Sequence, residues 1–498
     1  MPETAIPIES SLRPSADDRD DFARSATNWL TDAGDTSVLR PAIVNTQLDP
    51  GAYTAASGTL TGIIGAYVWK SVFNQREYLV YIRQDRKIYA KDLITNVVSA
   101  LSSASAATQL DGSAPVAVFA EDSQRLVIAG GGQLQIWVGN VATLSARIAA
   151  TVFGVNQPPL SATHVISLQN YLVANNAALP GGNNQIAWSG LGDTNHVTWN
   201  PLNFNTADAD PDAIVAIYAN LREVFAFGTK TLQVFGIGSD STLPFASSAA
   251  MSIGLAAAYS PVRLDGQFAW LDEARRFVIG DGRSAQEISQ DINNTLRGLT
   301  TVTDCRGFRV RLGYWDLLVW IFPTEGKAFV YDQAKQRWRL WRGWDGIDSY
   351  AALRIAAYVY WPTGNLHIVG DPLYENLWTL SADAGSDTAT GQPIVGEIVT
   401  ERLDWGTPKP KRCKKVRFFC KRGINASAAT FLDVAKSDDD GAWSGAATLS
   451  LGVAGDYQGF VDWRPGGIYR RRQYRIRYSG GDAATITKAV EYWEELGD

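Results

Sequence analysis

Residues 317–332 read LLVWIFPTEGKAFVYD, which is an apolar run, a short turn around Gly326 and a second apolar run. Two such runs joined by a turn that contains glycine predict a β-hairpin. The apolar residues from Leu317 to Phe322 are continuous, which is typical of a strand that is covered on both faces. This unit therefore predicts a small buried sheet.

The same unit occurs seven times along the chain. The other copies are YLVYIRQDRKIYAKDL (78–93), RLVIAGGGQLQIWVG (125–139), YLVANNAALPGGNNQIAWSG (171–190), EVFAFGTKTLQVFGIG (223–238), QFAWLDEARRFVIGDG (267–282) and NLHIVGDPLYENLWTL (365–380). Successive copies start 44 to 52 residues apart. A period of about 40 to 50 residues with paired strands is the signature of propeller blades, because each small sheet buries its faces against its neighbours. We therefore predict an all-β fold with a β-propeller of six or seven blades. A stack of β-sandwiches is the alternative, and it explains the near-regular spacing less well.

Two regions depart from this period. Residues 1–60 are polar and turn-rich, so we expect an extended N-terminal arm and one or two strands that lead into the propeller at 61–385. The stretch SADAGSDTATGQ (381–392) has nothing to bury and predicts a domain boundary. Residues 394–498 then predict a C-terminal antiparallel β-sandwich. Its expected strands are 395–405, 414–420, 429–435, 459–463, 473–478 and 488–493.

Composition excludes several classes of protein. Hydrophobic residues make up 46% and charged residues 19%, which is typical of a globular chain. The net charge of −6 gives no overall basic field that would indicate nucleic-acid binding. The start lacks the pattern of a secretory signal and no apolar run approaches about 18 residues, so we expect a chain made in a reducing cytoplasm with no membrane span. Cys413 and Cys420 are seven residues apart, so on one regular strand they would lie on opposite faces and would not form a disulfide.

Few residues suit catalysis or metal binding. His164, His196 and His367 are far apart, and none has the spacing of a metal ligand pair. Cys305 has no nearby histidine that could activate it as a nucleophile. Residues 437–443 (SDDDGAW) approximate the Asp-box turn of sialidase-type propellers, but the favoured interpretation is an acidic turn with the tryptophan packed beneath it. We therefore expect no catalytic residues, no metal and no cofactor.

Two basic groups stand out in the C-terminal region, residues 394–498, which contains 17 basic and 14 acidic residues. Their members are Lys409, Lys411, Arg412, Lys414, Lys415, Arg417, Lys421, Arg422, Arg470, Arg472, Arg475 and Arg477. The favoured interpretation is a docking surface for an acidic partner protein. Contact with DNA phosphates, which would make binding strongly dependent on salt, and solvated strand faces are the alternatives. In the second group, alternation places Gln473, Arg475 and Arg477 on one strand face and Tyr474, Ile476 and Tyr478 on the other.

The segment IGLAAAYSPVRLDGQFAWLDEARRFVIGDGRSAQEISQDI (253–292) resembles the tail nozzle, or packaged-DNA stabilisation protein, of short-tailed bacteriophages. The matching features are Ile253-Gly254, Ser260, Asp265 before an aromatic strand (268–271), and Glu287-Ile288-Ser289 after the hairpin. Asn28-Trp29 followed by Leu39-Arg40-Pro41 is similar to the N-terminus of that family.

The resemblance implies a structural, non-enzymatic virion protein, assembled in the host cytoplasm and located in the tail. It implies a ring of subunits, a hexamer in that family, whose channel retains packaged DNA and conducts it during ejection without sequence specificity. The implied partners are tail adaptor or portal-associated proteins, tail fibres or tailspikes, and tail-tip proteins.

A propeller that binds or hydrolyses glycans is the competing class. Exposed Trp and Tyr side chains could stack on sugars, and Asp272, Glu273 and Asp281 could supply the acid and base of a hydrolase. A hydrolase needs two carboxylates that converge in one pocket, and a lectin needs a tryptophan position that repeats across blades. The repeats show no such position. A structural scaffold of cellular origin is a further alternative.

Overall fold

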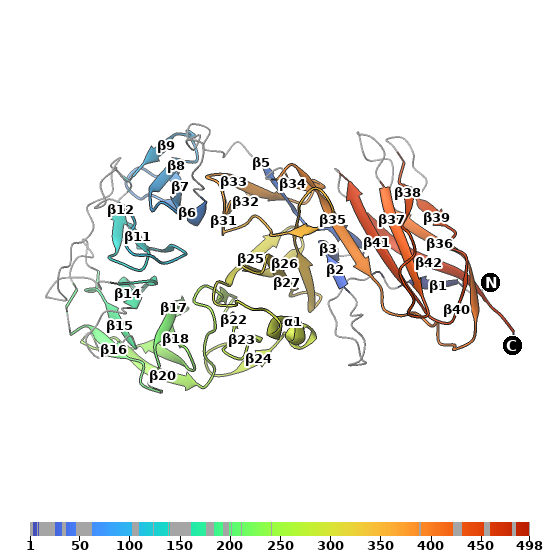
Figure 1. Ribbon diagram of the computed structural model, residues 1–498. Coiled ribbons are helices and arrows are strands. Elements are labelled where there is room, and N and C mark those ends of the chain that lie inside the picture. The colour runs from blue at the N-terminus through green and yellow to red at the C-terminus, as the bar shows by residue number, and fades with distance from the viewer. Residues whose placement is uncertain are drawn as a thin grey trace. The chain divides into compact units, whose positions relative to one another are not determined.

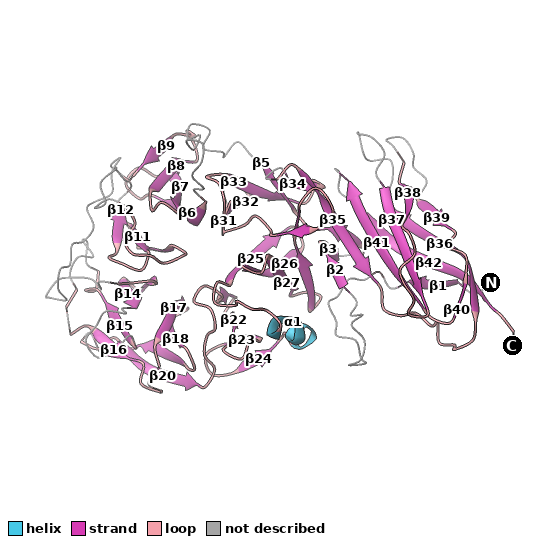
Figure 2. Ribbon diagram, viewed as in Figure 1, coloured by secondary structure: helices cyan, strands magenta, loops and turns pink. Residues whose placement is uncertain are grey.

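The computed structural model describes residues 3–6, 8, 25–31, 36–45, 62–101, 109–122, 124–137, 139, 161–175, 184–192, 199–200, 202–210, 212–240, 242–387, 390–421, 431–452, 459–480 and 485–497. Among these residues the fold is almost entirely β-structure, with one short helix, α1 (Asn293–Arg297), beside a 3-10 turn at Gln290–Ile292 (Figure 2). The chain divides into two compact units. Unit 1 comprises Met1–Asn45, Arg309–Leu353 and Thr379–Asp498, and unit 2 comprises Thr46–Phe308 and Arg354–Trp378.

Unit 2 is a β-propeller of six blades within the described residues, each blade a small antiparallel sheet (Figure 1). The first three blades are β6 (Ile63–Lys70), β7 (Glu77–Arg83), β8 (Ile88–Asp92) and β9 (Val98–Ala100); β10 (Val118–Glu121), β11 (Leu126–Ala129) and β12 (Gln135–Trp137); and β13 (Val165–Leu168), β14 (Tyr171–Asn175), β15 (Gln185–Trp188) and β16 (Phe204–Thr206). The next three are β17 (Ile214–Asn220), β18 (Glu223–Gly228), β19 (Leu232–Ile237) and β20 (Phe245–Met251); β21 (Val262–Arg263), β22 (Phe268–Leu271), β23 (Phe277–Gly280) and β24 (Ala285–Glu287); and β31 (Ala357–Trp361), β32 (Leu366–Gly370) and β33 (Leu377–Ser381). The predicted propeller is therefore confirmed.

Each blade buries its faces against the next. Val80 and Ile82 of the first blade pack with Leu126 and Ile128 of the second, and separate clusters join the second to the third, the third to the fourth and the fourth to the fifth blade. A further cluster brings the last blade against the first, because Ile368 and Leu377 pack with Leu79 and Tyr81. Burial on both faces explains why these strands are almost continuously apolar.

Unit 1 contains the N-terminal strands, one further hairpin sheet and the C-terminal strands. Its strands are β1 (Glu3–Ile6), β2 (Ser25–Thr27), β3 (Trp29–Thr31), β4 (Ser37–Leu39), β5 (Ala42–Asn45), β25 (Arg306–Leu312), β26 (Trp315–Phe322), β27 (Lys327–Asp332), β28 (Arg337–Trp341), β29 (Gly343–Trp344), β30 (Tyr350–Ala351), β34 (Ser386–Asp387), β35 (Gln392–Val399), β36 (Lys411–Cys420), β37 (Phe431–Asp438), β38 (Ala447–Ser450), β39 (Phe460–Trp463), β40 (Ile468–Tyr469), β41 (Arg472–Gly480) and β42 (Thr485–Glu495). Strands β25 to β28 are the seventh copy of the repeat. In the same sheet, β28 pairs in parallel with β2, and β2 pairs with β35.

The C-terminal strands form the predicted sandwich. One sheet has the order β3-β4-β42-β36-β39, and β35, β41, β37 and β38 are neighbours in the other. Trp29, Val416 and Phe418 from the first sheet share a single buried cluster with Ile476 and Tyr478 from the second. The two inner faces therefore enclose one core, as in an antiparallel β-sandwich.

The segment predicted to have nothing to bury instead holds a buried ion pair. Asp387 of β34 is 4% exposed and pairs with Arg40, which is 1% exposed. Arg40 also donates a hydrogen bond to Asn28 Oδ1, and Asn28 Nδ2 donates to the carbonyl oxygen of Val395. The polar sequence around Asp387 gives no sign of this burial, because its partner Arg40 lies far away in the chain. The domain boundaries expected at residues 60, 385 and 394 remain predictions.

Candidate functional site

Strand β36 carries most of the first basic group and alternates between an inner and an outer face. Cys413 and Cys420 are both buried in the sandwich core, whereas Arg412 and Lys414 are exposed. The prediction that the two cysteines lie on opposite faces is therefore wrong. The register against β42 shifts between Cys413 and Lys415, and this β-bulge inserts one extra residue that reverses the alternation.

The exposed basic side chains of this group have acidic partners on the neighbouring strands. Lys414 Nζ lies 2.6 Å from a carboxylate oxygen of Glu494 on β42, and Lys409 Nζ lies 2.8 Å from Glu495. Hydrogen bonds from Lys414 lower the pKa of Glu494, and hydrogen bonds from Lys409 lower that of Glu495. Arg412 is a weaker partner of Glu494, at 3.8 Å.

Asp462 of β39 is shared by two basic side chains of β36. Arg417 donates from Nε and Nη2 to its two carboxylate oxygens, at 2.6 and 2.8 Å, and these hydrogen bonds lower the pKa of Asp462. Lys415 Nζ lies 3.6 Å from the same carboxylate. The bidentate pair fixes the guanidinium plane, which lies 3.7 Å from the Phe460 ring centroid. The strand therefore presents a mixed-charge surface and not an unbalanced positive one.

Two members of the predicted set lie inside the fold. Lys411 is 0% exposed, and its Nζ donates to the carbonyl oxygens of Thr407 and Lys409. Arg472 is also 0% exposed and pairs with Asp438. Neither is available to a partner in this fold. Lys421 is exposed at the end of β36, and Arg422 lies outside the described residues.

The second basic group is spread along β41 and the turn before it. As predicted, Tyr474, Ile476 and Tyr478 are buried in the core. Arg475 lies over the ring of Trp443, 5.0 Å from the centroid, and Arg477 lies over that of Trp344, at 4.5 Å. The Arg470 backbone N–H donates to Asp439, and its Nη1 donates to the carbonyl oxygen of Pro408. Aromatic faces thus hold the two strand arginines.

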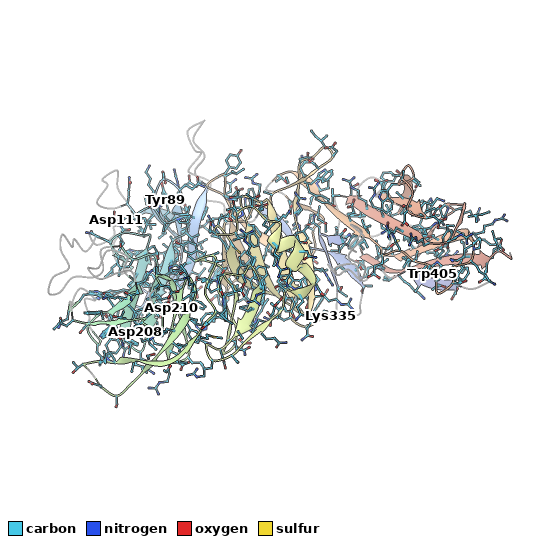
Figure 3. The ribbon with its side chains drawn as sticks, turned by 60° about the horizontal axis from the view of Figure 1, so that its bottom comes forward. Tyr89, Asp111, Asp208, Asp210, Lys335 and Trp405 are labelled. Carbon is cyan, nitrogen blue, oxygen red and sulfur yellow. The ribbon has the colours of Figure 1, made fainter. Side chains whose placement is uncertain are left out.

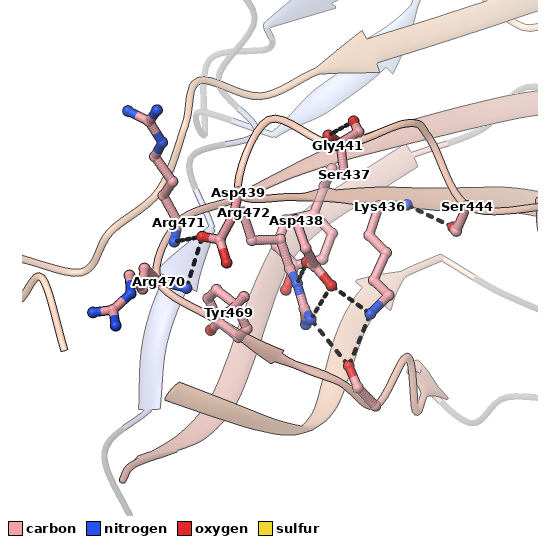
Figure 4. A network of polar contacts seen from close by, with 12 residues as sticks. Lys436, Ser437, Asp438, Asp439, Gly441, Ser444, Tyr469, Arg470, Arg471 and Arg472 are labelled. Carbon is pink, nitrogen blue, oxygen red and sulfur yellow. Dashed lines mark hydrogen bonds and ion pairs between the residues drawn. The ribbon is translucent and has the colours of Figure 1, made fainter. Parts of the chain in front are cut away.

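The SDDDGAW stretch forms an acidic turn whose carboxylates bind protein groups (Figure 4). Asp438 accepts hydrogen bonds from Lys436 Nζ and from Arg472, and Asp439 accepts the backbone N–H groups of Arg470 and Arg471. Ser437 donates its hydroxyl to the carbonyl oxygen of Gly441. The turn therefore ties β37 to the start of β41.

Arg472 also approaches a buried polar cluster around Glu491 of β42. Glu491 is 0% exposed and accepts hydrogen bonds from the Tyr469 hydroxyl at 2.6 Å and from Nε1 of Trp405 at 3.0 Å (Trp405 is labelled in Figure 3). Arg472 Nη1 lies 3.5 Å from the same carboxylate. Burial, together with the charge of Glu491, raises the pKa of Tyr469, so its hydroxyl remains a donor at neutral pH.

The carboxylates that could serve a glycan hydrolase are engaged in separate turns. Asp272 is buried and binds the backbone N–H and the guanidinium of Arg276. Glu273 accepts the backbone N–H of Gly254, and Asp281 accepts that of Arg283. These interactions stabilise the blade β21–β24 and its contacts.

The histidines and Cys305 also lie in structural surroundings. His164 is buried, and burial lowers its pKa to about 4, so it is neutral at physiological pH. His367 accepts or donates a hydrogen bond with the Tyr358 hydroxyl at 2.8 Å, and His196 lies outside the described residues. Burial raises the pKa of the Cys305 thiol well above its usual range. Among the described residues, no group of three or more His, Cys, Asp or Glu side chains is placed to hold a metal ion.

The residues of the 253–292 segment that carry the phage resemblance have structural roles. A Cβ on Gly254 would lie 2.3 Å from the carbonyl oxygen of Thr229, so only glycine allows this close approach of two backbones. Ser260 accepts the backbone N–H of Leu271 and donates to the carbonyl oxygen of Ala257. Ser289 accepts the backbone N–H of Phe277. These residues hold the blade β21–β24 in place.

One feature of unit 2 has no signal in the sequence. A cavity of about 220 Å³ is lined by residues from well-separated segments, among them Tyr218, Tyr259, Arg306, Phe308 and Tyr358. Arg306 is the one charged residue of this lining.

The family model described as "Bacteriophage P22 Gp10, beta-propeller" matches residues 49–385, which is more than half of the chain. The chain belongs to this family. Membership of the P22 Gp10 propeller family means that it is a phage structural protein connected with DNA stabilisation, and therefore a virion component. The resemblance seen in the blade at 253–292 is confirmed.

No curated protein matches the chain. Among solved structures, the RRP9 WD40 repeats share 9% identity with a TM-score of 0.42, covering 69% of this chain and 99% of that one. BBS1N in complex with ARL6DN shares 12% identity with a TM-score of 0.40 (69% and 97% covered), and BamB from Moraxella catarrhalis shares 12% with a TM-score of 0.40 (76% and 96% covered). With TM-scores this low, no argument about this member of the P22 Gp10 family rests on them. Within the part of the chain that the structure describes, no helix has the length and hydropathy to cross a bilayer.

Proposed function

We propose that this chain is a tail nozzle protein: a ring of subunits, six by the family resemblance, that closes the DNA exit channel of a short phage tail. The ring retains packaged DNA and conducts it during ejection. The match of the P22 Gp10 family model across residues 49–385 is the observation that carries this proposal. The role is structural and not enzymatic, and the protein is assembled into the tail in the host cytoplasm.

The charge distribution supports a conduit for DNA. The chain has a net charge of −6, and the exposed basic side chains of β36 are paired with Asp462, Glu494 and Glu495. Each phosphate that a protein neutralises adds affinity, so a dense, unpaired basic lining would slow the passage of duplex DNA. A mixed-charge surface of this kind instead suits partner selection between proteins.

We therefore assign the C-terminal basic strands to docking on neighbouring tail proteins. The candidates are the tail adaptor or portal-associated proteins, the tail fibres or tailspikes, and the tail-tip proteins. DNA passes through the ring without sequence-specific contacts.

Electron-microscopy class averages of the concentrated protein, alone and with the adaptor encoded beside it, test the ring. A closed ring whose lumen admits duplex DNA is the expected result, and its symmetry gives the copy number. Single compact particles under both conditions would refute the ring, and a glycan-binding screen would then test the competing class.

Charge reversal tests the docking assignment. We expect the triple variant Lys414→Glu, Lys415→Glu and Arg417→Glu to lose tail assembly, while the exposed control Arg222→Glu assembles normally. Circular dichroism of each purified variant checks that it folds. The assignment is wrong if the folded triple variant assembles fully but alters DNA retention.

A further inference from the structure

The cavity of unit 2 combines aromatic walls with an isolated positive charge. Tyr218, Tyr259, Phe308 and Tyr358 contribute rings to a lining that is otherwise mostly small and apolar, and Arg306 supplies its charge. Phe308 and Tyr358 stack with ring centroids 4.8 Å apart, so this wall is fixed by packing. At about 220 Å³ the cavity is smaller than the roughly 300 Å³ or more of most drug-sized pockets, so its occupant must be small.

The guanidinium of Arg306 is held by backbone carbonyl groups. Its Nη1 donates to the carbonyl oxygen of Ala356 at 3.0 Å, and its Nη2 donates to that of Pro115 at 3.4 Å. Burial lowers the pKa of Arg306, and the nearby Asp304, Tyr259 and Cys305 act in the opposite direction without overcoming it. Carbonyl dipoles orient a guanidinium but leave its charge uncompensated.

A second guanidinium lies beside the first. Arg86 Nη2 donates to the carbonyl oxygen of Ala114 at 2.8 Å, the residue directly before the Pro115 that Arg306 binds. Arg86 Nη1 is buried and has no hydrogen-bond partner among the described residues. Arg86 and Arg306 both interact electrostatically with the phenol of Tyr259.

Within the described ranges neither arginine forms an ion pair with a carboxylate, and the charges of both act on the phenol of Tyr259. Burial raises the pKa of Tyr259 to about 12, so its hydroxyl is protonated at neutral pH and can donate a hydrogen bond. Two guanidiniums and a phenol are donors only toward an incoming oxygen, which is the arrangement that proteins use for phosphate and carboxylate groups.

We propose that this cavity binds a small oxyanion, a phosphate or a carboxylate group, at Arg306 and Tyr259 of its lining. The anion accepts hydrogen bonds from the Arg306 guanidinium and the Tyr259 hydroxyl, the positive charge of Arg86 nearby favours it, and any apolar part of its carrier packs on Phe308 and Tyr358. This site is independent of ring formation and of the docking role of the C-terminal strands.

Isothermal titration of the full chain with sodium phosphate, and separately with sodium acetate, tests the site at an ionic strength held constant with sodium chloride. We expect saturable binding of at least one of the two anions with one site per chain. Because a hydrogen bond to a charged group contributes about 1.5 to 3 kcal/mol, Arg306→Gln should weaken that binding by about 10- to 100-fold, and Arg86→Gln, which removes a nearby positive charge and no donor of the lining, should weaken it less. The exposed control Arg222→Gln should bind as the wild type does.

The pattern across the two anions identifies the ligand class. Tighter binding of phosphate assigns a phosphate or phosphomonoester, and tighter binding of acetate assigns a carboxylate. The absence of saturable binding for both, or a folded Arg306→Gln variant that binds like the wild type, would overturn the proposal. If Arg306→Gln does not fold, Tyr259→Phe carries the same test, because it removes a donor of the lining without removing the residue that spans Ala356 and Pro115.

Discussion

The pairing of β36 predicts a specific response to removal of its acidic partners. Five basic side chains, Lys409, Arg412, Lys414, Lys415 and Arg417, face three carboxylates, Asp462, Glu494 and Glu495, so the local net charge is +2. Neutralising the three carboxylates as Asp462→Asn, Glu494→Gln and Glu495→Gln raises it to +5. Because the salt dependence of DNA binding has a slope of about −0.9 per neutralised phosphate, the expected slopes are about −1.8 for the wild type and about −4.5 for the variant.

Fluorescence anisotropy of a labelled duplex, titrated with protein at several salt concentrations, measures these slopes. The variant should bind DNA more tightly at low salt, and its affinity should fall more steeply as salt is added. A control variant, Asp208→Asn, Asp348→Asn and Asp383→Asn, removes the same negative charge from exposed positions elsewhere. It should leave the slope near that of the wild type.

The reasoning fails if the wild-type protein already shows a slope near −4.5 and the triple variant does not change it. That result would mean that the basic side chains of β36 are free to bind phosphates and that the DNA-contact interpretation is correct. A control slope as steep as that of the triple variant would show that overall charge, and not the local pairing, governs binding.

Three further predictions concern stability. Arg472→Ala removes the cation beside the buried Glu491 and one of the two cations that pair with Asp438, so the free energy of unfolding should fall by about 3 to 5 kcal/mol in denaturant titrations; a loss below about 1 kcal/mol would show that the pairing is dispensable. Arg40→Ala should cost a similar amount because Asp387 is then buried unpaired, and an unchanged denaturation midpoint would refute this. Burial raises the pKa of Asp438, but hydrogen bonds from Arg472 and Lys436 outweigh it and lower the pKa below the usual 3.8. The unfolded chain then binds more protons than the folded chain, so this stabilisation is complete above about pH 4 and is lost as pH falls through the lower folded pKa. Asp438→Asn should therefore make the melting temperature depend less on pH over that range. An unchanged dependence of the melting temperature on pH would contradict this prediction.

The repeat along the sequence predicted the fold because blade hairpins are local. Each hairpin, such as β18–β19, places two apolar runs within about 16 residues, so pairing and turn are both visible in the sequence. The alternation in β41 likewise predicted the buried face of Tyr474 and Ile476, because that ladder is regular.

The failures have a different origin. The β-bulge at Lys414 depends on the register of β36 against β42, about 80 residues away, so counting along one strand could not place Cys413. The burial of Lys411 and Arg472 depends on carbonyl and carboxylate partners from other elements. A basic run in a sequence indicates charge, whereas the pairing that neutralises the charge belongs to the tertiary structure.

The site in unit 2 shows the same limit more strongly. Arg86 and Arg306 are 220 residues apart in the chain, and they meet only because both bind carbonyl groups of the segment Ala114–Pro115. Neither belongs to a motif or a charge cluster. Only the closure of the propeller brings Arg306 into the cavity and Arg86 to the same backbone segment.

The retention of packaged DNA is the central claim, and nuclease protection of filled phage particles tests it most directly. Particles assembled without this chain should release their DNA, so that nuclease digests most of the genome, and adding back the purified protein before release should restore protection. Equal protection of the genome with and without the chain would contradict the proposed role.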